Sequence, residues 1–73
     1  MRYRFQDIFR ENQDGSLTPI SHIKIGSANI GPGLSFKDGV SFGGVNIFDF
    51  KGKDIEAEQA RGVLIIRGFY RET

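Results

Sequence analysis

The stretch "DIEAEQARGVLIIRGFY", residues 54–70, decides the fold that this sequence predicts. In its first half, apolar and acidic residues alternate, which is the period-two pattern of a strand with one buried face. Residues 59–62 include a glycine and separate this run from a second apolar run, an arrangement typical of a β-hairpin. A four-residue loop there pairs Ala57 with Leu64, so the apolar side chains of the two strands share a face.

The second strand of this hairpin, "VLIIRGFY", carries apolar side chains on both of its faces. Regular alternation gives two sets, with Val63, Ile65 and Phe69 on one face and Leu64, Ile66 and Tyr70 on the other. A strand that is apolar on both faces is typical of a central strand covered from two sides. A chain of 73 residues can cover both only by closing into a barrel or by binding a second subunit. We therefore predict that the face with Val63, Ile65 and Phe69 is an interface.

The rest of the chain consists of short apolar runs broken by glycine, which favours strands over helices. Ten glycines interrupt the sequence, and each would cost a helix about 1 kcal/mol relative to alanine. We expect strands at residues 2–9 and 17–26, joined by a turn at Asp14-Gly15. Residues 45–50 fit either a bulged strand or a single helical turn. The prediction is an all-β fold of five or six short strands, built from hairpins as an antiparallel meander or partly open barrel and completed by oligomerisation.

Two interpretations fit "LSFKDGVSF", residues 34–42. A three-residue loop at residues 37–39 makes a β-hairpin that pairs Phe36 with Val40 and places the apolar side chains on one face. Alternatively, Gly-x-Ser-Phe recurs after six residues, as in one rung of a hexapeptide β-helix. A β-helix needs several such rungs, which this chain could supply only by stacking on other chains. The hairpin is the preferred interpretation, and the rung remains the alternative.

Length and composition limit how so small a chain can be stabilised. A domain of this size buries only about 60% of the surface that its unfolded chain exposes. The sequence has no cysteine and a single histidine, His22, so disulfides and ordinary zinc sites lack their ligands. We expect one domain over residues 1–73 that binds no metal or cofactor and gains stability by self-association. No run approaches the roughly 20 apolar residues of a membrane span, so we expect a cytoplasmic protein without a membrane partner.

All six arginines lie near the two ends of the chain, although the net charge is only +1. They alternate there with aromatic residues, as in "RYRF" and "IRGFYR". Aromatic side chains that stack bases, next to cations that contact phosphates, are how small barrels bind single-stranded nucleic acid. The candidate nucleic-acid patch comprises Arg2, Tyr3, Arg4, Arg67, Tyr70 and Arg71.

Few side chains in this sequence are suited to catalysis. Ser21 and His22 are neighbours in a predicted strand, so they point to opposite faces and cannot pair as nucleophile and base. Glu56 and Glu58 share a strand face about 7 Å apart, but their position beside a hairpin tip favours a solvated surface. We therefore predict a non-enzymatic interaction or assembly module that binds itself or another protein. A small barrel that binds single-stranded nucleic acid through its terminal strands is the alternative.

Overall fold

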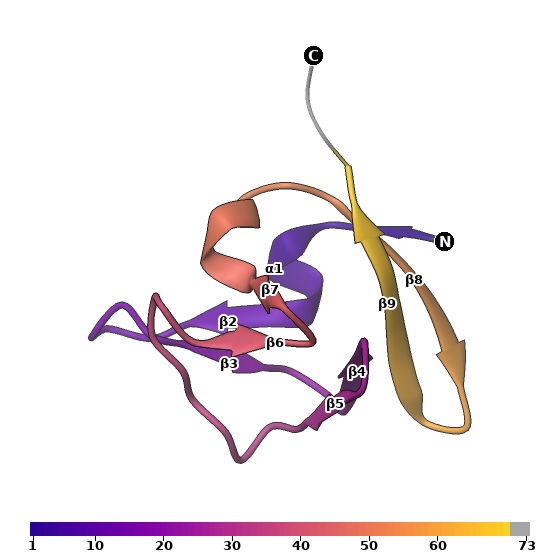
Figure 1. Ribbon diagram of the computed structural model, residues 1–73, viewed down its shortest axis with the longest axis horizontal. Coiled ribbons are helices and arrows are strands. Elements are labelled where there is room, and N and C mark those ends of the chain that lie inside the picture. The colour runs from indigo at the N-terminus through magenta and orange to yellow at the C-terminus, as the bar shows by residue number, and fades with distance from the viewer. Residues whose placement is uncertain (71–73) are drawn as a thin grey trace.

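The computed structural model describes residues 1–70 and confirms the all-β class (Figure 1). One five-stranded sheet has the order β1-β8-β9-β4-β5, and two small two-stranded sheets pair β2 with β3 and β6 with β7. The strands are β1 (Arg2–Tyr3), β2 (Phe9–Glu11), β3 (Leu17–Pro19), β4 (Ile23–Ile25), β5 (Ala28–Ile30), β6 (Ser41–Phe42), β7 (Val45–Asn46), β8 (Ile55–Ala60) and β9 (Val63–Phe69). The helices are α1 (Phe5–Ile8) and a 3₁₀-helix, η1 (Ile47–Phe50). The large sheet stays open, because β1 and β5 lie at opposite ends of the strand order.

The C-terminal hairpin of β8 and β9 forms as predicted, but its turn is tighter than expected. Arg61 and Gly62 alone form the turn, with φ of 54° and 78°. Positive φ at both positions defines a type I′ turn, whose twist matches that of the flanking strands. Ala57 therefore pairs with Ile66, and the predicted pairing with Leu64 is wrong by two residues. A shift of two residues leaves every side chain on its predicted face, whereas a shift of one would invert them all.

A β-bulge in β9 changes the faces near its C-terminal end. Ile66 pairs with Ala57 and Gly68 pairs with Glu56, which leaves Arg67 between them without a partner in β8. One extra residue in a strand moves all later side chains to the opposite face.

Phe69 is the residue most affected by this bulge. It pairs with Ile55, whose side chain is 0% exposed, and it packs against the core. Its ring stacks on that of Phe50 from η1, with 4.3 Å between the centroids and 10° between the planes. The prediction that Phe69 shares a face with Val63 and Ile65 is therefore wrong. Only the latter two remain on the face away from the core.

The five-stranded sheet contains one parallel pair, which a simple antiparallel meander does not have. β9 runs parallel to β4, with Ile23 opposite Leu64 and Ile25 opposite Ile66. The chain between β4 and β8 returns to the end of the sheet at which β4 finishes. β8 starts there and runs back, so β9, which follows it, runs parallel to β4. Ile23, Ile25, Leu64 and Ile66 are all buried, so the parallel pair forms the centre of the sheet's inner face.

The N-terminal segment is not the single strand that the alternation of residues 2–9 predicts. β1 ends at Tyr3 and is followed by α1, one helical turn, before β2 begins at Phe9. Phe5 and Ile8 are both buried, because residues three apart lie on the same side of a helix. The Asp7 carboxylate accepts a hydrogen bond from the Arg4 backbone N–H (3.3 Å) at the helix N-terminus. The expected turn at Asp14-Gly15 does join β2 to β3.

Residues 34–42 form neither the predicted hairpin nor a β-helix rung. Phe36 instead forms an antiparallel bridge with Leu17, with two backbone hydrogen bonds of 2.9 Å. β6, at the end of this stretch, pairs with β7 across a Gly43-Gly44 turn. Of the predicted hairpin only the turn is present, closed by a hydrogen bond from the Val40 N–H to the Lys37 carbonyl (3.3 Å). For residues 45–50 the helical-turn alternative is confirmed, since η1 follows β7 directly.

The core lies between the inner face of the five-stranded sheet and a second layer of α1, η1 and the small hairpins. Figure 1 shows these elements on one side of β8 and β9. Phe36 is at the centre of this second layer and meets three other rings edge-on, those of Phe9, Phe42 and Phe48. The buried apolar side chains form one cluster: Phe5, Ile8, Phe9, Leu17, Ile23, Ile25, Ile30, Phe36, Ile47, Ile55, Ala57, Leu64 and Ile66.

Candidate functional site

The face of the five-stranded sheet opposite the core, called the outer face below, is the first candidate. Side chains alternate between the two faces along a strand, and paired residues on neighbouring strands share a face. The outer-face residues are therefore those that alternate with, or pair with residues that alternate with, the side chains buried on the inner face. The outer face comprises Arg2, Lys24, Asn29, Glu56, Glu58, Ala60, Val63, Ile65, Arg67 and Tyr70. No other strand or helix of residues 1–70 packs over it.

Four outer-face residues form a row across the middle of the sheet. Ile65 on β9 lies between Lys24 on β4 and Glu58 on β8, and Lys24 pairs in turn with Asn29 on β5. Val63 lies two residues before Ile65 on the same strand, and both side chains are half-buried by their neighbours. The predicted apolar pair therefore lies on the open face, with a cation on one side and a carboxylate on the other.

A shallow depression adjoins Ile65 on the outer face. β4 ends at Ile25, which pairs with Ile66, whereas β9 continues to Phe69. This last part of β9 therefore has β8 on one side and no strand on the side of β4. The depression has a volume of about 410 Å³ and is lined by Lys24, Gly26, Ile65, Ile66 and Arg67. Gly26 contributes no side chain to fill it. Two cations, Lys24 and Arg67, therefore border the depression beside Ile65, and Arg67 contacts the Glu58 carboxylate at 3.3 Å.

Two residues of the predicted nucleic-acid patch, Arg2 and Tyr70, lie together at one edge of the outer face. The Arg2 guanidinium lies 4.1 Å from the centre of the Tyr70 ring and also bonds the Asp54 carboxylate at 2.7 Å. The Glu56 carboxylate accepts hydrogen bonds from the N-terminal ammonium group and from the Tyr70 hydroxyl. These two donors lower the pKa of Glu56, and the bond to Glu56 raises the pKa of Tyr70.

The rest of the predicted nucleic-acid patch is not gathered at one place. Tyr3 pairs with Ile55 on the inner side and packs against the core, with its hydroxyl 3.6 Å from the Met1 sulfur. Arg4 is exposed at the start of α1, and Arg67 is ion-paired with Glu58. Arg71 lies outside the described residues. Carboxylates thus accompany Arg2 and Arg67, so this edge has little excess positive charge.

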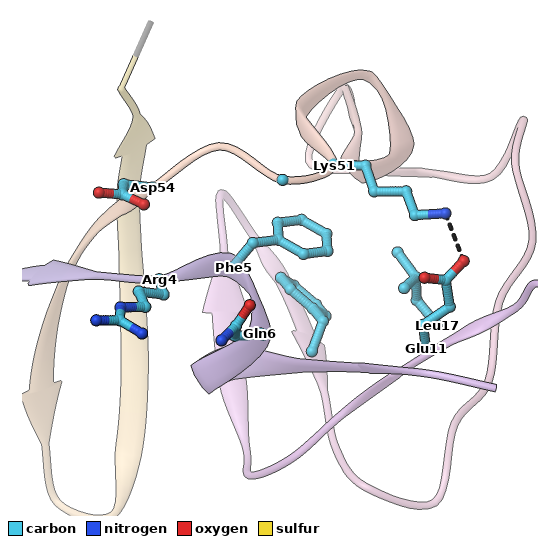
Figure 2. A pocket seen from close by; sticks show the side chains of 9 residues that line it. Arg4, Phe5, Gln6, Glu11, Leu17, Lys51 and Asp54 are labelled. Atoms are coloured by element: carbon cyan, nitrogen blue, oxygen red, sulfur yellow. Dashed lines mark hydrogen bonds and ion pairs between the residues drawn. The ribbon is translucent and has the colours of Figure 1, made fainter. Parts of the chain in front are cut away.

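A pocket of about 290 Å³ beside α1 and β2 is a further candidate (Figure 2). Phe5 and Leu17 form its floor, Phe9 also lines it, and the Lys51–Glu11 ion pair spans one side of it. Arg4, Gln6, Gly52 and Asp54 complete the lining. The floor side chains are nearly covered already, with Phe5 8% and Leu17 1% exposed. An apolar ligand would therefore gain little from contact with them.

A polar network inside the β2–β3 hairpin has no clear signal in the sequence. The Asn12 amide donates to Ser16 Oγ (3.0 Å) and to Thr18 Oγ1 (2.8 Å), and Thr18 Oγ1 lies 2.8 Å from Ser35 Oγ. The Asp14 carboxylate accepts hydrogen bonds from the Ser16 hydroxyl (2.6 Å) and N–H (3.0 Å), which lower its pKa. Ser16 and Thr18 are buried, so the network holds the hairpin against residues 34–36 rather than facing a substrate.

The geometry does not support a catalytic or metal-binding role for the remaining residues that the sequence offered. His22 packs over Gly31, where an added Cβ would lie 2.9 Å from its Nε2. Glu56 and Glu58 are on the outer face beside cations and line neither pocket. Among residues 1–70, no three side chains of His, Cys, Asp or Glu are grouped so that they could hold a metal ion.

Comparison with known protein families, with curated proteins and with solved structures finds no match to this chain. Within the described part of the chain, neither helix has the length or apolar character needed to cross a membrane. The functional argument therefore depends on geometry alone, and the outer face is the surface where apolar side chains and unlike charges are arranged in a regular row.

Proposed function

We propose that this protein is a non-enzymatic interaction module that binds a second copy of itself through its outer face. The observation that supports this best is the row across the sheet, in which Ile65 lies between Lys24 and Glu58. A surface with an apolar centre and opposite charges on its two sides is complementary to itself. Such self-complementarity is what a symmetric homodimer interface requires.

The size of the outer face indicates a weak association. Five strands spaced about 4.8 Å apart span roughly 20 Å, and the strands are short, so one copy would bury a few hundred Å². Stable interfaces bury about 800 Å² per partner. Only Val63 and Ile65 are large aliphatic residues at the centre of the face. We therefore expect a reversible dimer with a dissociation constant in the micromolar range or weaker.

Sedimentation equilibrium over a wide concentration range tests this proposal. The wild-type protein is expected to show a monomer–dimer equilibrium, and Ile65→Lys to abolish it by placing charge at the centre of the interface. Val40→Lys is the matched control, because Val40 is 43% exposed and lies in the turn after Phe36, away from the outer face. A monomeric wild-type protein at all concentrations, or equal effects of the two variants, would refute the proposal.

The nucleic-acid alternative has one supporting observation, the contact between Arg2 and the Tyr70 ring. The same contact counts against it, since Arg2 covers a face of the ring on which a base would stack and is itself paired with Asp54. A fluorescence titration with single-stranded RNA and DNA at two salt concentrations separates the alternatives. Binding that weakens steeply with salt would favour nucleic acid, because it reports contacts to phosphates.

A further inference from the structure

We propose that two copies pack their outer faces about a two-fold axis that runs along β9, with Lys24 of each copy opposite Glu58 of the other. The inference rests on the proposed self-association and specifies its geometry. It follows from the strand register, which fixes where each charge lies relative to Ile65.

A two-fold axis that brings identical faces together lies in the plane between them. Aligned sheets keep their strand directions within about 30° of each other, so the axis of an aligned pair runs nearly along the strands or nearly across them. An axis along β9 exchanges the two sides of the strand. Lys24, on the β4 side, then faces the partner's Glu58, on the β8 side, and the contact occurs twice. Ile65 faces the partner's Ile65, and Val63 likewise faces the partner's Val63.

An axis across the strands gives a worse arrangement. It keeps the two sides of β9 in place and reverses positions along the strand about Ile65. Lys24 would then face the partner's Lys24, and Glu58 the partner's Glu58, so like charges would oppose each other on both sides. Val63 would face the partner's Arg67 rather than an apolar side chain. Juxtaposed like charges disfavour an interface, and the charge pattern therefore selects the axis along β9.

Arg67 lies at the edge of the same interface. It already contacts Glu58 of its own chain at 3.3 Å, and both side chains are more than half exposed. In the dimer, each Glu58 would lie between its own Arg67 and the partner's Lys24. The two Arg67 side chains would come together at one end, where the neighbouring Glu58 carboxylates offset their repulsion. The depression next to Lys24 leaves room for its side chain to turn toward the partner.

A charge-reversal series measured by sedimentation equilibrium tests this geometry. Lys24→Glu turns two attractive contacts into two repulsive ones, so we expect the dimer to weaken by about tenfold or more. The double variant Lys24→Glu/Glu58→Lys re-forms both pairs with the charges exchanged, so we expect it to dimerise more tightly than Lys24→Glu. It should remain weaker than wild type, because the change at position 58 also replaces the carboxylate partner of Arg67 by a cation. Lys37→Glu is the control, since it makes the same charge change on an exposed turn away from the outer face.

Cross-linking distinguishes the two axes directly, because the chain has no cysteine of its own. Facing sheets lie about 10 Å apart, too far for a disulfide, so a short bismaleimide is the reagent. We expect an equal mixture of Lys24→Cys and Glu58→Cys chains to cross-link, and Lys24→Cys alone to react poorly across roughly 14 Å.

Efficient cross-linking of Lys24→Cys alone, or a double charge variant no tighter than Lys24→Glu, would overturn this geometry while leaving the proposed self-association intact. A wild-type protein that is monomeric throughout would instead refute the proposed function, and the geometry with it.

Discussion

Replacing Gly43 with alanine should destabilise the fold much more than the same change at the next residue. Both Gly43 and Gly44 have positive φ, 57° and 80°, in the turn between β6 and β7. A Cβ on Gly43 would lie 2.7 Å from the Ile25 carbonyl oxygen and 3.1 Å from the Gly26 Cα, whereas a Cβ on Gly44 would have no atom within 4 Å. Gly44→Ala is therefore the matched control for backbone strain.

The magnitudes follow from these contacts. A left-handed backbone costs a residue with a Cβ about 1 to 2 kcal/mol, which both variants incur. In Gly43→Ala the contact is with main-chain atoms of β4 and the turn after it, which cannot rotate away, so overpacking adds about 1 to 3 kcal/mol. The total is about 2 to 5 kcal/mol, against a stability of about 4 to 11 kcal/mol for 73 residues.

Urea denaturation followed by far-UV circular dichroism measures the difference, since the chain has no tryptophan. We expect the free energy of unfolding of Gly43→Ala to be at least about 1 kcal/mol below that of Gly44→Ala. Equal losses in the two variants would mean that the close approach of these two turns does not hold the β6–β7 hairpin against the sheet.

Three other predictions concern the C-terminal hairpin and the polar network. Phe69→Ala should lower the free energy of unfolding by about 2 kcal/mol and Val63→Ala by less than about 1 kcal/mol, because the bulge turns only Phe69 inward; equal losses in urea denaturation would contradict the inward position. Arg61→Asn should stabilise the protein by about 0.5 to 1 kcal/mol in the same assay, since asparagine tolerates the φ of 54°. Hydrogen bonds from Ser16 lower the pKa of Asp14, so its carboxylate stabilises the folded state above the usual Asp pKa, and this contribution disappears as the pH falls through the lowered pKa. The stability difference between wild type and Asp14→Asn should therefore be largest above about pH 5 and shrink steadily in acid, and a difference independent of pH would count against the Asp14–Ser16 bonds.

The C-terminal hairpin shows how far sequence reasoning extends into this fold. Alternation placed Leu64 and Ile66 toward the core and Val63 and Ile65 away from it, and the structure confirms both placements. The register was wrong because the type I′ turn requires a positive φ at Arg61, a conformation that a non-glycine residue rarely adopts. Turn type depends on the twist of the paired strands, which the local sequence does not contain.

Long-range pairing explains the other errors. Local turn chemistry favoured a hairpin at residues 34–42, but Phe36 forms a bridge with Leu17, far from it in sequence, and packs among three aromatic rings. The burial of one large ring outweighs a marginal two-stranded ribbon. The parallel pairing of β4 with β9 likewise depends on contacts between distant segments.

The candidate site was predictable in part. The two apolar residues of the open face follow from alternation. The contact between Arg2 and Tyr70 does not, because alternation had placed Tyr70 on the face of Leu64 and Ile66, and the β-bulge reverses that position. The positions of the opposing carboxylates do not follow from the sequence either. Asp54 and Glu56 lie beside Arg2 and Tyr70 because β1 adds to the edge of β8. The pairing of β1 with β8 joins segments that are far apart in the sequence.

Methyl NMR spectra recorded over a dilution series, from about 1 mM to about 20 µM, test the central claim most directly. If the outer face binds a second copy, the methyl resonances of Ile65 and Val63 will shift with concentration, while those of Val40, which is exposed elsewhere, will stay fixed. Shifts confined to Val40, or no change in Ile65 at any concentration, would contradict the account.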